Sequence, residues 1–240
     1  MNRLHSWDLS TGVDGPGTRF VAFLAGCPLR CLYCQNPDTW HMRDGEPTTA
    51  DEVLNKLAGF ADFVRIAGGG FTVSGGEPLL QPQFTRDLLT GAKALGLHTA
   101  LDTSGALGAR ATDALLDATD LVLLDIKAWD PLRYRRLTGG NIAPTLSFAR
   151  RLAERGTPVW IRYVLVPGHT DDPSEVEGVA GFAASLGNVE RIDVLPFHRL
   201  GAAKYQRLGI PFPLQDTAPP DPATIDRVRD QFRTVGVPVC

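Results

Sequence analysis

The chain has 240 residues, of which 43% are hydrophobic and 21% charged, and its formal net charge is −3 at pH 7 with histidine neutral. This composition is typical of a globular protein and excludes a disordered chain, and a slightly acidic balance without a basic block excludes nucleic acid as the main partner. No apolar run reaches the roughly 18 residues of a membrane span, and residues 1–7 lack the apolar core of a signal peptide, so we expect a cytoplasmic protein.

Short apolar segments rich in strand-forming residues alternate along the chain with amphipathic segments. The expected strands are residues 19–25, 70–74, 98–102, 120–126, 159–166 and 191–196. The expected helices are residues 49–64, 83–95, 109–118, 145–154, 174–186 and 222–235. Strands that alternate with helices predict βαβ units and a parallel sheet. Six units are fewer than the eight of a closed barrel, so the sequence predicts an α/β fold, a partial open (β/α)6 barrel in a single domain spanning residues 1–240.

Chemically distinctive residues follow the carboxyl ends of these strands, the edge where parallel α/β proteins bind ligands. They are Cys27, residues 74–77, residues 102–104, residues 125–127 and His198, with Arg162 inside its strand. We therefore expect the functional site at this edge. Residues 199–222, rich in glycine and proline, are expected to form a substrate-facing loop or a partly ordered lid.

Three cysteines, Cys27, Cys31 and Cys34, lie within eight residues. Closed structural zinc and iron–sulfur sites use four protein ligands, whereas three thiolates on a four-iron cluster leave one iron open for a reacting molecule. The alternative is a Cys3His zinc site with His41 or Cys240 as the fourth ligand, although no second cysteine pair completes a common zinc pattern. Otherwise Cys240 is expected to be a frayed, incidental thiol.

The spacing Cys27-x3-Cys31-x-Tyr33-Cys34 resembles the signature of the radical S-adenosylmethionine (SAM) enzymes. The resemblance implies a partial barrel of the radical SAM type and one 4Fe-4S cluster held by the three thiolates, with Tyr33 beside the cofactor. The open iron would bind the amino and carboxylate groups of SAM. One electron would then cleave SAM to methionine and a 5′-deoxyadenosyl radical, so the cofactors supply the chemistry.

The strand-end motifs extend the resemblance. By itself Gly75-Gly76-Glu77-Pro78 is only a turn, but with the cysteines it resembles the family's Gly-Gly-Glu motif. The resemblance implies that Gly76 contacts the amino group of SAM, while Glu77 acts electrostatically or supports the loop.

Asp102 and Asp125 end neighbouring predicted strands, with Lys127 two residues beyond the second. From the residues alone, these groups form either a structural ion pair or a site for a cationic ligand or cation. Arg162 leaves the same choice between an ion pair and a role in the site, and a lone histidine such as His198 is more often a surface or packing residue.

Leu-Asp-Thr-Ser-Gly at Asp102 and Leu-Asp-Ile-Lys at Asp125 resemble segments of the glycyl-radical-enzyme activases. This resemblance implies that the two acids lie near a monovalent cation beside the cofactor. It also implies cofactor contacts from Ile126 and Lys127 of the second segment, from His198 in Leu195-Pro-Phe-His, and from Gln35 directly after the cysteine motif. Gln35 is a departure, because activases of the pyruvate formate-lyase type usually have histidine there.

Val13-Asp14-Gly-Pro-Gly17, followed by Arg19-Phe20, is similar to the opening of these activases. The similarity implies that Asp14 engages the glycine loop of a target protein. The match is closest to the pyruvate formate-lyase type, because only one cysteine remains for the ferredoxin-like insert that other activases carry.

The resemblance implies activation of pyruvate formate-lyase by abstraction of hydrogen from a backbone glycine Cα. An external flavodoxin or ferredoxin would supply the electron, no residue would act as a general acid or base, and a monomer is expected. The alternatives are an activase of another glycyl radical enzyme, such as anaerobic ribonucleotide reductase, an iron–sulfur electron-transfer module, or a zinc-binding module.

Overall fold

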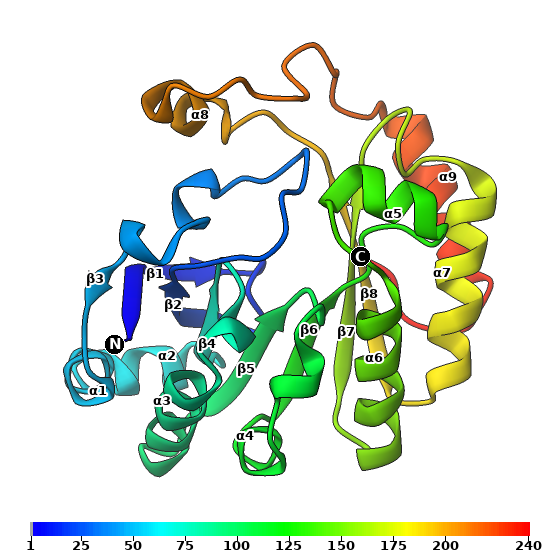
Figure 1. The fold of residues 1–240 in the computed structure, drawn as a ribbon. Coiled ribbons are helices and arrows are strands. Elements are labelled where there is room, and N and C mark those ends of the chain that lie inside the picture. Colours follow the sequence, from blue (N-terminus) through cyan, green and yellow to red (C-terminus); the bar gives the residue numbers. More distant parts are fainter. Residues whose placement is uncertain (1) are drawn as a thin grey trace. The chain divides into compact units, whose positions relative to one another are not determined.

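The computed structural model (Figure 1) describes residues 2–240 of an α/β protein. These residues divide into two compact units. The first unit contains residues 2–28, 39–103 and 107–123. The second contains residues 29–38, 104–106 and 124–240. Strand β6 (Leu121–Asp125) begins in the first unit and ends in the second, and each unit is described in turn.

The strands of the first unit follow the order β3-β1-β2-β4-β5 and then the beginning of β6. Their bounds are β1 Arg3–Thr11, β2 Thr18–Leu24, β3 Glu46–Pro47, β4 Gly70–Gly75 and β5 His98–Thr103. β1 is antiparallel to both β2 and β3, whereas β2 runs parallel to β4 and β4 parallel to β5. The carboxyl ends of β2, β4 and β5 therefore meet at one edge of this unit.

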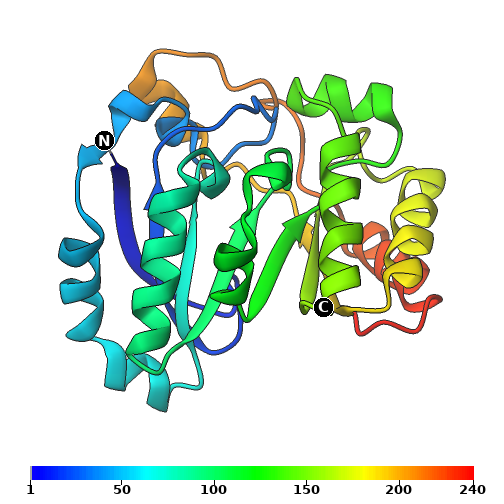
Figure 2. The same ribbon diagram turned by 60° about the horizontal axis from the view of Figure 1, so that its bottom comes forward.

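Helices α1 (Ala50–Ala58), α2 (Ala61–Ile66), α3 (Pro82–Ala94) and α4 (Asp113–Asp117) belong to the first unit. α3 lies against β4 and β5, as Figure 2 shows. α1 begins at a capping box, in which Thr49 accepts from the Glu52 amide and the Glu52 carboxylate accepts from the Thr49 amide. Phe20, Phe71 and Leu88 are among the fully buried side chains of this unit.

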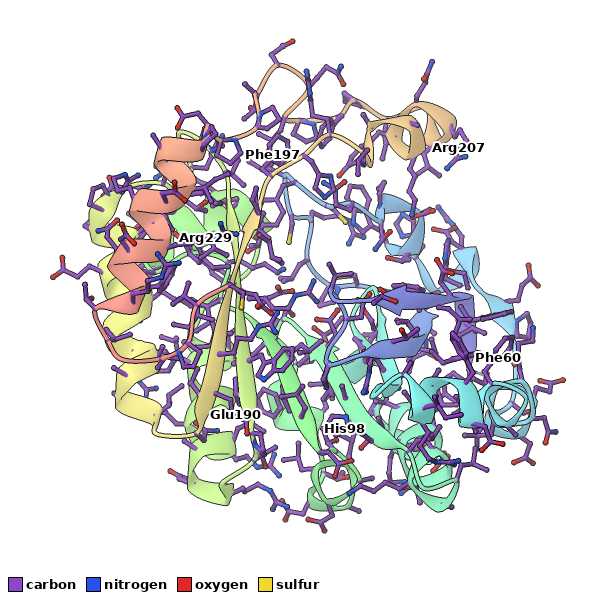
Figure 3. The ribbon with its side chains drawn as sticks, turned by 180° about the vertical axis from the view of Figure 1, so that it is seen from behind. Phe60, His98, Glu190, Phe197, Arg207 and Arg229 are labelled. Atoms are coloured by element: carbon purple, nitrogen blue, oxygen red, sulfur yellow. The ribbon has the colours of Figure 1, made fainter. Side chains whose placement is uncertain are left out.

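In the second unit, the end of β6 is followed in strand order by β7 (Val159–Leu165) and β8 (Val189–Pro196), which are parallel to each other. Its helices are α5 Pro131–Thr138, α6 Ala143–Arg155, α7 Pro173–Leu186, α8 Ala202–Leu208 and α9 Pro222–Arg233. α7 and α9 pack on β8 and on each other. Figure 3 shows Glu190 near the start of β8 and Phe197 beyond its carboxyl end.

Three helices of the second unit begin in the same way. Asp130, Asp172 and Asp221 each cap the amino end of a helix, and proline follows each of them as the first helical residue. The aspartate accepts backbone N–H groups that the first turn cannot satisfy, and proline has no N–H to lose there. This Asp-Pro pair fixes where α5, α7 and α9 begin.

The predicted α/β class and open sheet are confirmed, because β3 and β8 end the strand order without pairing with each other. All six predicted strands are present, as β2, β4, β5, β6, β7 and β8. Two strands were not predicted: β1, which is largely half-exposed, and the two-residue β3. The division into a single domain stays a prediction.

Three helical expectations need correction. Residues 49–64 form two helices instead of one, because the chain turns at Gly59 and Phe60. α5 was not predicted, and residues 199–222 contain the helix α8.

Cys240 is not frayed, since its amide donates to Ile192 and its carbonyl accepts from Val194 of β8. Among residues 2–240, no helix combines the length and the apolar character needed to cross a membrane.

Candidate functional site

The turn that carries Cys27 is fixed by backbone contacts within the first unit. The amides of Gly26 and Cys27 donate to the carbonyls of Thr39 and Trp40, at 2.7 and 3.1 Å. Gly26 has φ of 94°, and a Cβ there would lie 2.5 Å from Leu80 Cδ2 and 2.6 Å from Met42 Sδ. Glycine is therefore required just before the first cysteine, both for its backbone conformation and for space.

The Gly-Gly-Glu segment packs directly against this turn. The Gly76 amide donates to Leu24 O and the Glu77 amide donates to Gly26 O, both at 2.8 Å. A Cβ on Gly76 would lie 2.3 Å from Gly26 O, and one on Gly75 would lie 2.2 Å from the Leu24 amide nitrogen. These glycines let the end of β4 approach the cysteine turn. The contact of Gly76 with a cofactor stays a prediction.

Glu77 supports the loop through hydrogen bonds of its buried carboxylate. It is fully buried, and its Oε1 accepts from Thr103 Oγ1 at 2.6 Å and from the Leu79 amide at 3.1 Å. A buried carboxylate held in this way joins the end of β4 to the end of β5. Of the two roles expected for Glu77, support of the loop is the one that these contacts favour.

Asp102, also at the end of β5, is oriented by Ser74, which the sequence placed at the site edge without a partner. Ser74 Oγ donates to Asp102 Oδ2 at 2.6 Å. The register of β4 and β5, with Val73 opposite Leu101, predicts that Ser74 and Asp102 are neighbours on one face. The contact between Ser74 and Asp102 depends on the pairing of these strands, which the sequence alone does not supply.

Asp14 is anchored within the first unit through both its side chain and its backbone. Ser10 Oγ donates to the Asp14 carboxylate, and the Asp14 carbonyl accepts from Thr72 Oγ1 at 2.7 Å. Thr72 Oγ1 in turn accepts from Nε of Arg19 at 3.0 Å. His98 lies at the start of β5 (Figure 3), and its Nδ1 also contacts this guanidinium at 3.0 Å.

The Arg19 side chain is fully buried beneath the Asp14 loop. Burial lowers the pKa of Arg19 to about 10, and the carboxylates of Asp120 and Asp14 oppose that shift. The guanidinium remains charged at neutral pH. A lone arginine in an apolar strand is the sequence signal from which this buried anchor could have been predicted.

In the second unit, the end of α5 holds the segment that carries Cys31 and Cys34. The amides of Arg30 and Leu32 donate to the carbonyls of Thr138 and Leu137, at 2.8 and 2.9 Å. The Cys34 amide donates to Cys31 O at 3.1 Å, which closes a tight turn. The backbone of this segment therefore depends on a helix that was not predicted.

Lys127 lies beside this turn and forms an ion pair with Asp125, with Nζ 3.0 Å from Oδ2. The ammonium also lies 5.7 Å from the centroid of the Tyr33 ring. Burial opposes the charge of Lys127, but attraction to Asp125 outweighs it and raises the pKa of Lys127 well above its usual value. Lys127 is therefore a positive charge at any physiological pH.

Burial also acts on the two neighbours of Lys127. It raises the pKa of the Cys31 thiol to about 11, against the opposing pull of Lys127. It raises the pKa of Tyr33 well above the usual value, and the Tyr33 hydroxyl, 5% exposed as a residue, has no hydrogen-bond partner among residues 2–240. Ile126 is buried beside them, and its amide donates to Arg162 O at 3.2 Å.

Gln35 connects the cysteine segment to the chain after β8. Its Nε2 donates to Tyr33 O at 3.1 Å and to His198 O at 3.0 Å, and its Oε1 accepts from the Gly201 amide at 2.8 Å. His198 itself is exposed. The Gln35 side chain is thus engaged with protein backbone, and its contact with a cofactor stays a prediction.

The predicted ligand set divides between the units, with Cys27 in the first and Cys31 and Cys34 in the second. Across residues 2–240, no three or more His, Cys, Asp or Glu side chains are gathered as a metal-ion site, and the three-cysteine ligand set stays a prediction. The donor chemistry fits an iron–sulfur cluster, because thiolates prefer soft metals. A metal would also stabilise the thiolate that burial of Cys31 disfavours.

The amino-acid sequence is similar to those of known proteins along nearly its whole length. The sequence model of the Radical SAM superfamily matches residues 21–178. The pyruvate formate-lyase-activating enzyme of Staphylococcus epidermidis is 44% identical over 239 residues, covering 97% of this chain and 94% of that protein. The pyruvate formate-lyase 1-activating enzyme of Escherichia coli K12 is 41% identical over 238 residues, covering 98% and 97%.

Solved structures give the same picture of the fold. A domain of a pyruvate-formate lyase-activating enzyme from Bacteroides vulgatus superimposes with a TM-score of 0.61 at 27% identity, covering 72% of this chain and 98% of that one. A radical SAM methyltransferase from Sphaerobacter thermophilus superimposes with a TM-score of 0.67 at 18% identity, covering 97% and 67%. The second likeness concerns the fold alone.

Proposed function

Because the chain belongs to the radical SAM superfamily and, within it, to the family of pyruvate formate-lyase-activating enzymes, we propose that it activates pyruvate formate-lyase. Activation would consist of reductive cleavage of SAM and abstraction of hydrogen from a backbone glycine Cα of that target. The observation that carries the proposal is 41% identity to the Escherichia coli enzyme over 98% of this chain.

The superfamily implies a 4Fe-4S cluster and SAM as cofactors. We propose Cys27, Cys31 and Cys34 as the cluster ligands. When bound, the cluster supplies the electron for SAM cleavage. The chain's own contribution is to fix the sulfur-bearing backbone: Thr39 and Trp40 accept from the turn at Cys27, and the end of α5 accepts from the segment around Cys31.

For SAM we propose contacts from the second unit at Tyr33, Ile126, Lys127 and His198, and from the first unit at Gly76. The permanent charge of Lys127 supports a role beside the SAM carboxylate. Gln35 would act through the backbone that it holds. We propose Asp102 and Asp125 as ligands of a monovalent cation, because both present carboxylate oxygens.

The remaining partners follow from the same family membership. We propose that Asp14 contacts the target's glycine loop, and its anchoring through Thr72 supports this role because an anchored loop loses less entropy on binding. A flavodoxin or ferredoxin would supply the electron in the cytoplasm. The active protein would be a monomer, with residues 1–240 forming one domain without a ferredoxin-like insert.

The test begins with anaerobic reconstitution using iron and sulfide, followed by reduction in the presence of SAM. We expect 5′-deoxyadenosine and methionine, and a glycyl radical signal in electron paramagnetic resonance when pyruvate formate-lyase is added. A preparation that binds zinc without iron, or that is reduced without cleaving SAM, would overturn the proposal. A signal on anaerobic ribonucleotide reductase instead would reassign the target.

The ligand assignment is tested by a matched pair of cysteine variants. Cys31→Ala is expected to abolish 5′-deoxyadenosine formation, because two thiolates hold the cluster poorly. Cys240→Ala is expected to retain full activity, because its exposed thiol lies at the edge of β8. Iron and sulfide content of both variants shows whether loss of activity reflects loss of the cluster.

A further inference from the structure

We propose that Gln35 is a positioning residue that holds the backbone of His198–Gly201 on the cysteine segment and so sets the affinity for SAM. The effect on SAM affinity rests on the proposed function, whereas the claim that Gln35 holds the backbone of His198–Gly201 does not. All the residues involved belong to the second unit. We call Gln35, Lys204 and their hydrogen-bond partners the Gln35 clamp.

The first observation is that every hydrogen-bonding function of the Gln35 amide has a backbone partner of the opposite kind. Nε2 lies 3.1 Å from Tyr33 O and 3.0 Å from His198 O, both of which accept. Oε1 lies 2.8 Å from the Gly201 nitrogen, which donates. The partners fix the orientation of the amide, because a flipped group would place its oxygen against two carbonyls.

This set of partners is specific to a carboxamide. Two donors and one acceptor are needed on one short side chain, and glutamine supplies them. A neutral histidine has one donor and one acceptor, and a glutamate carboxylate has no donor. Glutamine, which stands where these activases usually have histidine, is therefore the residue type that this arrangement requires.

The second observation is the close packing of Gly201 on Gln35. A Cβ on Gly201 would lie 2.9 Å from Gln35 Oε1 and 3.0 Å from Gln35 Cα. A larger residue at this position would have to displace the Gln35 side chain and press on its backbone, so glycine favours the close approach that lets the Gly201 amide reach the glutamine. Gly201 is buried, and its carbonyl accepts from the Lys204 amide at 2.9 Å as α8 begins.

Lys204, in the first turn of α8, supplies the other half of the clamp. Its Nζ donates to Asn36 Oδ1 at 2.7 Å and to Asp38 Oδ1 at 3.1 Å. Residues 35–38, directly after Cys34, are thus bonded to residues 198–204 both through Gln35 and through Lys204. These bonds join two segments that are 166 residues apart in the chain at Gln35 and Gly201.

The consequence concerns His198, whose side chain is exposed while its carbonyl is held by Gln35. If the backbone moves, the imidazole moves with it. A cofactor contact made by His198 is then pre-arranged by Gln35 before SAM binds, and loss of the clamp raises the entropic cost of binding. Gln35 would therefore affect the KM for SAM more than kcat.

The effect of Gln35 on the backbone of residues 198–208 is tested by hydrogen exchange in four variants, with and without reconstitution. Gln35→Ala removes all three bonds, and Gln35→Glu keeps the shape but sets a carboxylate against two carbonyls. Exchange in residues 198–208 is expected to accelerate about tenfold or more in both, given the usual contribution of such bonds. Gln206→Ala, which changes an exposed glutamine of α8, is the matched control and should exchange like the wild type.

Unchanged protection of residues 198–208 in both Gln35 variants would overturn the clamp. Protection in α9 serves as a folding reference and should not change in any variant. Lys204→Met should accelerate exchange in the same residues, because it removes the second pair of bonds.

The part that concerns SAM is tested by 5′-deoxyadenosine formation at varied SAM concentration. Gln35→Ala is expected to raise the KM for SAM about tenfold with kcat within about twofold of the wild type. An unchanged KM in a variant with accelerated exchange would overturn the role in SAM affinity. If the wild type itself forms no 5′-deoxyadenosine, the proposed function fails, and hydrogen exchange still decides whether the clamp exists.

Discussion

Nζ of Lys127 lies 3.0 Å from Oδ2 of Asp125, and the two side chains are only 11% and 21% exposed. An ion pair this far from solvent is costly to break, since the remaining charge has no compensation. Asp125 is the last residue of β6, and Lys127 follows two residues later. Its formation raises the pKa of Lys127, in spite of burial.

We expect Asp125→Asn to lower the free energy of unfolding by about 2–3 kcal/mol, because it leaves a buried ammonium unpaired. Lys127→Met should lower the free energy of unfolding by a similar amount, because it leaves the buried Asp125 carboxylate unpaired. The double variant should lose less than the sum of the two, because neither charge remains. Urea unfolding of the metal-free proteins measures all three, and strict additivity would contradict the pairing.

Gly76→Ala should destabilise the protein, because its Cβ would lie 2.3 Å from Gly26 O. Backbone must shift to relieve that contact, and we expect a loss of about 2–4 kcal/mol. Gly181→Ala is the control: it lies within α7 with open space around it, and should stabilise by about 0.5–1 kcal/mol. Thermal unfolding of the two variants should therefore shift in opposite directions.

Thr103→Val should destabilise the protein by about 1–3 kcal/mol, since it removes the hydroxyl that donates to the buried Glu77 carboxylate. Thr103→Ser keeps the hydroxyl and should recover most of that loss. Chemical unfolding at neutral pH compares them. Equal stability of the valine and serine variants would show that the hydroxyl contributes nothing.

Asp120 should make stability depend on pH in acid. Burial alone would raise the pKa of Asp120, but the Lys93 ammonium and hydrogen bonds from Thr99 outweigh it and lower the pKa below its usual value. A carboxylate with a lowered folded pKa stabilises the protein above its unfolded pKa of about 3.9, and that stability disappears as pH falls through the folded value.

We therefore expect Asp120→Asn to be less stable than the wild type at pH 7 and to converge with it below about pH 4. Asp62→Asn, which changes an aspartate whose side chain is 88% exposed, should differ little from the wild type at either pH. Unfolding free energies measured from pH 3 to pH 7 test this. A constant difference across that range would contradict the assigned pKa direction.

Much of the fold could be predicted because its parallel strands are continuous apolar runs. Leu121–Asp125 is buried along nearly its whole length, as its sequence indicates. β1 escaped prediction because its residues are half-exposed and polar ones interrupt the pattern. α5 could have been found, because Asp130 and Pro131 form a recognisable helix start. α8 has only seven residues and no side-chain cap, so the local sequence contained little to reveal it.

Local sequence determined the cysteine spacing, the glycines of the turn before β2 and after β4, and the acids at the strand ends, since these depend on neighbours along the chain. Tertiary structure alone decided which of them touch. Ser74 meets Asp102, Thr103 meets Glu77, and Gly201 meets Gln35 only after strands and helices have packed. Hydrogen bonds act over about 3 Å in space and are indifferent to sequence separation, so patterns read along the chain do not encode them.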